Sequence, residues 1–147
     1  MNIRQGRPVT AAAILALAVL ALPACGGGAV DVTLREFEVA PAQDSASADS
    51  VTFSVANEGA ETHEFVVIKT DLAPEALPTA EDGSVDEEGG GIEVIGEIED
   101  IAAGDTQETT LDLDAGSYVL ICNLVEEEDG QVESHYQEGM HTAFTVE

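Results

Sequence analysis

The stretch that decides the fold is SYVLICNLVEEEDGQVESHYQEGMHTAFTV, residues 117–146. Its first part, 118–122, carries apolar side chains on both faces of a strand, which predicts a central strand that is covered on both sides. Its last part, 141–146, predicts a final strand with Phe144 and Val146 turned inward. Between these two strands lies a long acidic segment.

Short apolar alternations recur through the rest of the chain and predict further strands. They cover 30–39, with a bulge near Arg35 or Glu36, and also 51–55, 63–68, 92–101 and 109–113. The segment 71–91 differs, because it holds two prolines, seven acidic residues and four glycines. We expect a solvated excursion there, with at most one short helical turn near Pro74. Six to eight short strands without a long amphipathic helix predict an all-β fold, an antiparallel β-sandwich or Greek-key barrel.

The N-terminus has the pattern of an export signal. Arg4 and Arg7 precede twelve apolar residues, 11–22, which is short of the roughly 17 to 25 needed to span a bilayer. A buried core helix is the alternative. The run ends in Leu-Pro-Ala-Cys at 22–25, which resembles the lipobox of bacterial lipoproteins. That resemblance implies cleavage before Cys25 and a diacylglyceryl group on its sulfur, whereas the alternative is an ordinary secretory cleavage site with an incidental cysteine.

These signals divide the chain into three parts. Residues 1–24 are predicted to be a cleaved signal peptide, residues 25–29 a lipidated cysteine with a glycine-rich tether, and residues 30–147 a single domain. The predicted location is extracytoplasmic, with the protein lipid-anchored to the cell membrane.

The charge of the chain is strongly negative. Thirty acidic residues face four basic ones, and removing Arg4 and Arg7 leaves 2 − 30 = −28. Such a surface repels phosphate backbones, so nucleic acid is not an expected partner. Because high ionic strength screens this self-repulsion, a salt-loving host is our preferred explanation. A local acidic patch for a basic partner is less favoured, since the acids are spread over the whole chain.

A few residues can carry chemistry. If Cys25 is lipidated, Cys122 is the only other cysteine, and a lone thiol in an oxidising compartment is expected to be buried or bound to a metal. Together with His63, His135 and Met140 it forms a soft sulfur and nitrogen ligand set, which is typical of a copper site for electron transfer. Taken alone, a histidine at a strand end is more often a core or surface residue than a ligand, and a single buried cysteine is usually inert packing.

Three motifs together resemble the cupredoxins, the family of type 1 (blue) copper proteins. They are N-x-G followed by HEFVVI at 57–68, the turn and strand GSYVLICNL at 116–124, and HYxxGM at 135–140. The resemblance extends from about Val30 to Glu147 and implies a Greek-key β-sandwich.

The resemblance also implies a ligand set for one type 1 copper. His63, Cys122 and His135 would be the equatorial ligands, and Met140 the weak axial ligand. Zinc could use the cysteine and two histidines, but a methionine partner does not favour zinc. His141 is expected on the opposite face, outside the site. Because only this one histidine remains for a second copper centre, we do not expect an enzyme of the multicopper type.

The chain departs from the family pattern in two places. Twelve residues, 123–134, separate Cys122 from His135, where the family has a few, and we expect this insertion to bulge into solvent as a loop. Glu64 follows the first ligand, where many members have a small polar residue.

The leading hypothesis is a lipid-anchored blue-copper electron carrier on the outer side of the cytoplasmic membrane. We expect a monomer that exchanges electrons with redox proteins of unknown identity. The alternatives are a copper delivery or storage lipoprotein and a metal-free cupredoxin-like interaction domain.

Overall fold

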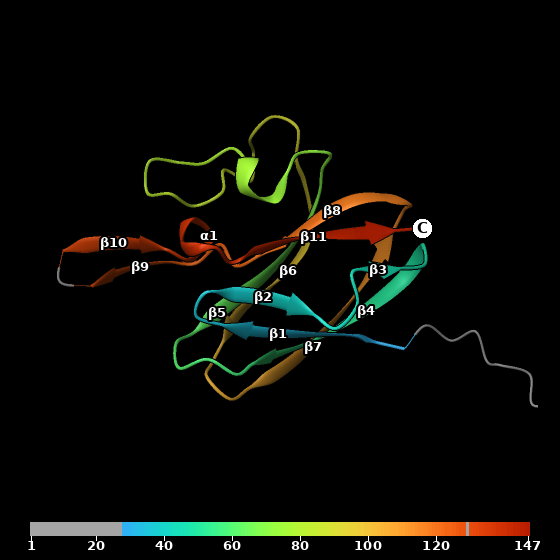
Figure 1. Ribbon diagram of the computed structural model, residues 1–147, viewed down its shortest axis with the longest axis horizontal. Helices are drawn as coiled ribbons and strands as arrows, with labels where there is room; N and C mark the ends of the chain where they lie inside the picture. Colours follow the sequence, from blue (N-terminus) through green and yellow to red (C-terminus); the bar gives the residue numbers. More distant parts are fainter. Residues whose placement is uncertain (1–27, 129) are drawn as a thin grey trace, which may run out of the picture.

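Two β-sheets pack against each other in the computed structural model, which describes residues 28–128 and 130–147 (Figure 1). The first sheet has the order β2 (Glu38–Pro41), β1 (Val30–Arg35), β4 (Asp49–Asn57) and β7 (Thr106–Leu113). The second has the order β3 (Ser45–Ala46), β11 (His141–Val146), β8 (Gly116–Ile121), β5 (His63–Lys69) and β6 (Glu93–Ile101). The predicted all-β sandwich is confirmed.

The sheets are mixed, which corrects the expectation of a purely antiparallel arrangement. β1 runs parallel to β4, and β3 runs parallel to β11. The other pairings in these two sheets are antiparallel. The parallel pairs arise because the chain passes between the two sheets after β2 and β3 instead of returning by hairpins.

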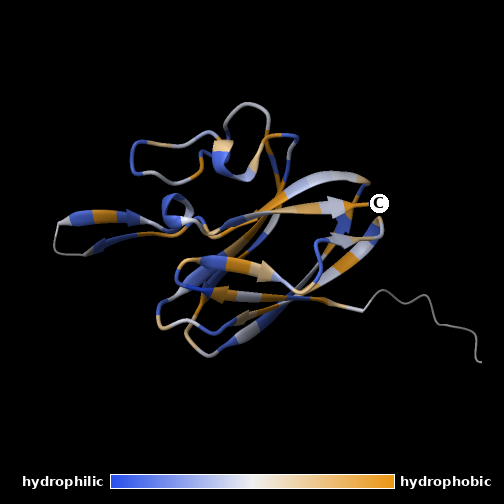
Figure 2. Cartoon of the chain, viewed as in Figure 1, coloured by the Kyte–Doolittle hydropathy of each residue, from blue (hydrophilic) through white to orange (hydrophobic). Residues whose placement is uncertain are grey.

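The core lies between the two sheets and follows from the period-two pattern of the strands. In β4, Val51, Phe53 and Val55 are buried, and Figure 2 shows the same alternation of hydrophobic and hydrophilic residues along β1. The Phe53 ring lies 5.3 Å from the ring of Phe65 in β5 and 5.6 Å from that of Phe144 in β11. These aromatic contacts join the inner faces of the two sheets.

The prediction that 118–122 is a central strand covered on both faces is confirmed. β8 lies between β11 and β5, and its Val119 and Ile121 belong to a second, smaller core on the outer face of the sheet. Leu77 and Val85 also belong to that core. We expected 71–91 to be a solvated excursion. Instead, its Leu77 and Val85 cover the outer face of this sheet. The excursion does contain the predicted helical turn, η1 (Pro74–Ala76).

The first predicted strand is two strands. β1 ends at Arg35, and β2 returns antiparallel to it, with Leu34 opposite Val39. Both of these side chains are buried, so the hairpin adds the second one to the core beside the first. The turn places Glu36 and Phe37 at the end of the sheet, where we had expected only a bulge.

The insertion 123–134 leaves the body of the sandwich as a paired ribbon, not as the loop we expected. β9 (Val125–Glu128) and β10 (Gln131–Ser134) pair antiparallel and project from one end of the molecule (Figure 1). A short helix, α1 (His135–Glu138), follows directly. Ser134 caps α1 by accepting a hydrogen bond from the Gln137 N–H at 3.3 Å, and Gly139 ends it with φ 117°.

Within the described ranges, no helix has the length and apolar character needed to cross a membrane. The predicted signal peptide and Cys25 lie outside the described residues.

Candidate metal centre

His63, Cys122 and His135 come together at one end of the sandwich. His63 opens β5, Cys122 follows β8, and His135 opens α1, yet all three are 0% exposed. The two Nδ1 atoms lie 3.2 Å apart. The Cys122 Sγ lies 3.5 Å from the His135 Nδ1 and 4.0 Å from the His63 Nδ1. Three donor atoms from three separate segments therefore form one small triangle.

The size of this triangle fits a single metal ion. Nitrogen and sulfur donors held about 2.0 to 2.3 Å from a common ion in one plane lie roughly 3.5 to 3.8 Å apart. The sides of 3.2 to 4.0 Å span that range. Two imidazoles and one thiolate with a nearby thioether are the donor set of a type 1 copper site. The residues present thus fit one type 1 copper.

Burial also disfavours ionisation of the Cys122 thiol. Burial raises the pKa of Cys122 to about 11, although the N–H groups of Glu64 and Leu124 act in the opposite direction. The thiolate is the form that binds metal, so a bound cation would have to supply the stabilisation that the protein surroundings withhold.

Met140, the predicted axial residue, is fully buried and tied to both neighbours in the cluster. The Cys122 N–H donates to the Met140 carbonyl oxygen at 3.0 Å. The Met140 N–H in turn donates to the His135 carbonyl oxygen at 3.0 Å. The backbone therefore keeps the thioether residue beside the triangle.

The role of Glu64 is divided between its backbone and its side chain. Its N–H donates to the Cys122 Sγ at 3.2 Å. Its carboxyl group lies with those of Glu87 and Glu97, and desolvation, followed by repulsion from these neighbours, raises its pKa to about 7. The support that it offers the sulfur thus comes from the main chain.

A carboxylate that our sequence analysis missed lies behind His63. Glu36 Oε1 is 3.2 Å from the His63 Nε2 and also accepts the N–H groups of Ala60 at 2.8 Å and Glu61 at 2.9 Å. The hydrogen bond from Glu61 is the main reason that the pKa of Glu36 is lowered. An ionised acceptor at this position orients the imidazole, as carboxylates commonly do behind metal-bound histidines.

Asn57 holds the loop that joins β4 to β5. Its Nδ2 donates to the carbonyl oxygens of Glu61 at 2.7 Å and Ile101 at 2.8 Å, and its Oδ1 accepts the Gly59 N–H at 2.9 Å. This residue is the asparagine of the N-x-G motif, so the sequence contained a signal for it. Glu36 had none, since it lies 27 residues before His63 in a hairpin turn.

His141 is half-buried and lies outside the triangle, with its ring 5.2 Å from that of Tyr136.

Two other side chains contact the His135 imidazole. The ring of Phe37 lies 5.5 Å from that of His135, edge on. The Nε2 of His135, which does not face Cys122, lies 3.7 Å from Glu61 Oε2.

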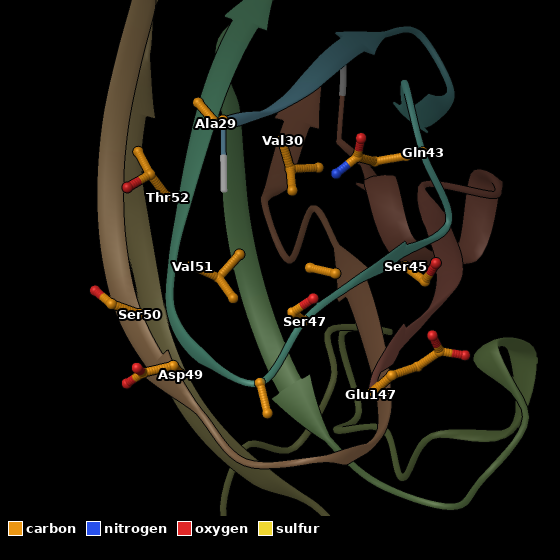
Figure 3. Close-up of a pocket in the computed structure, with 13 residues that line it drawn as sticks. Ala29, Val30, Gln43, Ser45, Ser47, Asp49, Ser50, Val51, Thr52 and Glu147 are labelled. Carbon is orange, nitrogen blue, oxygen red and sulfur yellow. The ribbon is translucent and has the colours of Figure 1, made fainter. Parts of the chain in front are cut away.

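A cavity of about 820 Å³ lies elsewhere, between the start of β1, the segment around β3 and the C-terminus (Figure 3). Its labelled side chains are mostly small or polar, among them Gln43, Ser45, Ser47 and Glu147. None of the triangle's residues lines this cavity, so it is not part of the metal centre.

The sequence matches no protein-family model and no curated protein. Solved structures do match. Auracyanin from Roseiflexus castenholzii has a TM-score of 0.52 at 18% identity, over 82% of this chain and 99% of that chain. Auracyanin A, a "blue" copper protein from Chloroflexus aurantiacus, has a TM-score of 0.50 at 20% identity, over 82% and 100%. Rusticyanin from Thiobacillus ferrooxidans has a TM-score of 0.52 at 16% identity, over 81% and 77%.

At these identities the likeness concerns the fold. The strand order, the buried triangle and the matched structures lead to one conclusion: the chain has the fold of the blue copper proteins, the cupredoxin β-sandwich that its three motifs predicted.

Proposed function

We propose that the protein is a blue-copper electron carrier anchored by lipid to the outer face of the cytoplasmic membrane. The observation that carries this proposal is the buried triangle of two Nδ1 atoms and one Sγ, with sides of 3.2 to 4.0 Å. The same fold in a "blue" copper protein supports it. We expect no catalytic activity, a monomeric protein, and redox proteins as its partners.

The residues of the chain would hold the metal with little movement. A bound copper would supply a one-electron couple between Cu(II) and Cu(I). His63 is held through its Nε2 by Glu36, and the Cys122 sulfur is held by the Glu64 N–H. Burial of all three triangle residues excludes water from the donor atoms. Because the donor atoms already converge, oxidation or reduction of a bound copper would require little movement of these side chains.

This burial favours a carrier over a copper delivery protein. Transfer of a metal ion to another protein requires new ligands to approach it, and His63, Cys122 and His135 are each 0% exposed. Electron transfer needs no such opening. A fast self-exchange rate would support the carrier, whereas slow exchange together with ready loss of copper to a chelator would favour delivery.

The test of the metal centre is a visible spectrum. Adding Cu(II) to the purified protein should produce an intense thiolate-to-copper charge-transfer band, and Cys122→Ser should erase it. A colourless wild-type protein, or a band that survives in the Cys122→Ser variant, would contradict the proposal.

The test of the anchor is fractionation. Two acyl chains on one residue suffice for stable attachment to a membrane, so Cys25→Ser should release the protein into the soluble fraction. Retention of that variant in washed membranes would show that Cys25 is not the anchor.

A further inference from the structure

The side of His135 that faces away from Cys122 is close to a carboxylate. Its Nε2 lies 3.7 Å from Glu61 Oε2. Glu133 completes a group in which one donor atom from each of Glu61, Glu133 and His135 lies within 4.8 Å of the other two. The contact with Glu61 uses the nitrogen opposite the one that faces Cys122, so it is separate from the triangle.

Two of these atoms lack partners. The His135 Nε2 and the Glu61 Oε2 are buried atoms without a hydrogen bond to any described residue, although the Glu61 side chain as a whole is 40% exposed. Their separation of 3.7 Å is too long for a hydrogen bond, and buried polar atoms are rarely left unsatisfied. The equivalent nitrogen of His63 does have a carboxylate, at 3.2 Å.

The spacing suits a cation between the two atoms. Donors about 2.0 to 2.2 Å from a tetrahedral ion lie roughly 3.3 to 3.6 Å apart, close to the observed separation. The side chain of His135 is 0% exposed, so its unpartnered nitrogen faces the Glu61 carboxylate and not solvent.

The surroundings of the group are strongly negative. Glu126 and Glu36 lie close enough to Glu61 to act on its carboxyl group by repulsion, and His135 acts in the opposite direction. Over residues 28–128 and 130–147, the basic side chains are Arg35 and Lys69, and they pair with Glu58 and Asp114. A bound cation would offset this negative charge.

We propose that Glu61, Glu133 and the His135 Nε2 bind a second divalent cation, with zinc as the best match. Zinc accepts histidine nitrogen and carboxylate oxygen together, and three protein ligands leave a fourth position for water. Because this inference rests on the proposed copper centre, His135 would join the two metal ions through its two nitrogens. Binding of zinc at the Nε2 would release the proton of that nitrogen to solvent.

This site assigns a role to the acidic insertion. Glu61 lies on the loop before β5, whereas Glu133 lies on β10 in the ribbon. A cation shared by the two would tie the ribbon to the body of the sandwich directly behind a copper ligand. The other acidic group, Glu64 with Glu87 and Glu97, contains no unpartnered buried atom of this kind and carries no such proposal.

The experiment is a zinc titration of the full chain, purified in detergent and loaded with one copper. We expect one zinc per chain with the copper retained, measured by metal analysis after desalting. Zinc X-ray absorption should show nitrogen and oxygen ligands and no sulfur. Glu61→Gln and Glu133→Gln should each weaken zinc binding by at least about tenfold, the scale on which even outer partners of metal ligands act. Glu87→Gln, which alters the other acidic group, should have no effect.

In the copper-loaded protein, three outcomes would overturn the proposal: sulfur among the zinc ligands, loss of copper as zinc binds, or zinc binding that neither glutamine variant weakens. The Cys122→Ser variant separates this proposal from the copper centre, since it keeps all three proposed zinc ligands. Zinc binding in that variant that is lost with Glu133→Gln would support the second site even if wild-type protein failed to bind copper. If zinc binding in the Cys122→Ser variant does not depend on Glu133, the second site is overturned and the proposed copper centre is unaffected.

Discussion

The body of the sandwich and the acidic ribbon, 125–134, contribute residues to the same candidate metal centre but are stabilised differently. The body packs fully buried aromatic rings, such as Phe53 and Phe65, between its sheets. The ribbon is mostly hydrophilic (Figure 2), and its Val132 is 57% exposed. The ribbon nevertheless leads directly into His135, whereas the body holds His63.

The ribbon can position the buried His135 because hydrogen bonds close it at its base. The His135 N–H donates to the Leu124 carbonyl oxygen at 3.0 Å, and the Ser134 hydroxyl donates to the Gly83 carbonyl oxygen at 2.8 Å. Residues between these contacts can project without moving the imidazole. Hydrogen bonds at His135 and Ser134 are therefore enough to fix the imidazole, and the segment before them need not be buried.

The comparison fails if the ligand at the end of the ribbon is dispensable. His135→Gly should abolish the copper band, because it removes one of three converging donors, and added imidazole should restore part of the colour by filling the vacated position. His141→Gly is the matched control and should leave the visible spectrum nearly unchanged. Bleaching by His141→Gly but not by His135→Gly would show that the ligand assignment is wrong.

The two regions should also differ in what they contribute to stability. Phe53→Ala should lower the free energy of unfolding by about 3 to 5 kcal/mol, because it leaves a cavity between the sheets. Val132→Ala in the ribbon should change it by less than about 0.5 kcal/mol, as at other exposed positions. Urea unfolding of both variants measures these values. Similar losses in the two variants would mean that the ribbon belongs to the folding core.

The Glu36 carboxylate, which contacts His63 in the body of the sandwich, should have a smaller, electrostatic effect on the copper centre. Glu36→Gln should raise the reduction potential, because the negative charge of Glu36 stabilises Cu(II) more than Cu(I). The change should not exceed about 59 mV, a tenfold shift for one electron, since the carboxylate is partly exposed. Glu58→Gln, which alters an exposed carboxylate that pairs with Arg35 and not with His63, is the control for voltammetry. Equal potentials in wild type and Glu36→Gln would contradict this role.

Salt should have the most gradual effect. The thermal midpoint should rise with ionic strength, because salt screens the repulsion among the 30 carboxylates. Replacing Glu126 and Glu127 of the ribbon by Gln should leave most of this dependence in place, since the acids are spread over the chain. A midpoint that stays flat from low to molar chloride in calorimetry would remove the argument for a salt-loving host.

The sequence by itself determined the fold class and the residue types of the site. Alternation of apolar residues, as in Val51–Val55, and the turn residues between strands are local properties, so they predict strands without knowledge of what packs against them. His63 is in phase with Phe65 along its strand, which predicts that it faces the interior, and both side chains are buried. The thiol, imidazole and thioether side chains favour copper because the type of donor atom, which the sequence gives directly, selects the metal.

Only the tertiary structure decided how these pieces meet. The acidic run at 126–129 has no apolar alternation, so nothing local predicted the pairing of β9 with β10, which depends on closure at the base of the ribbon. The hairpin at Glu36 and the covering of β8 by Leu77 likewise depend on contacts between distant segments. A carboxylate in a turn has no periodic signal. Its place behind a histidine is set by the folding of both segments onto the same core.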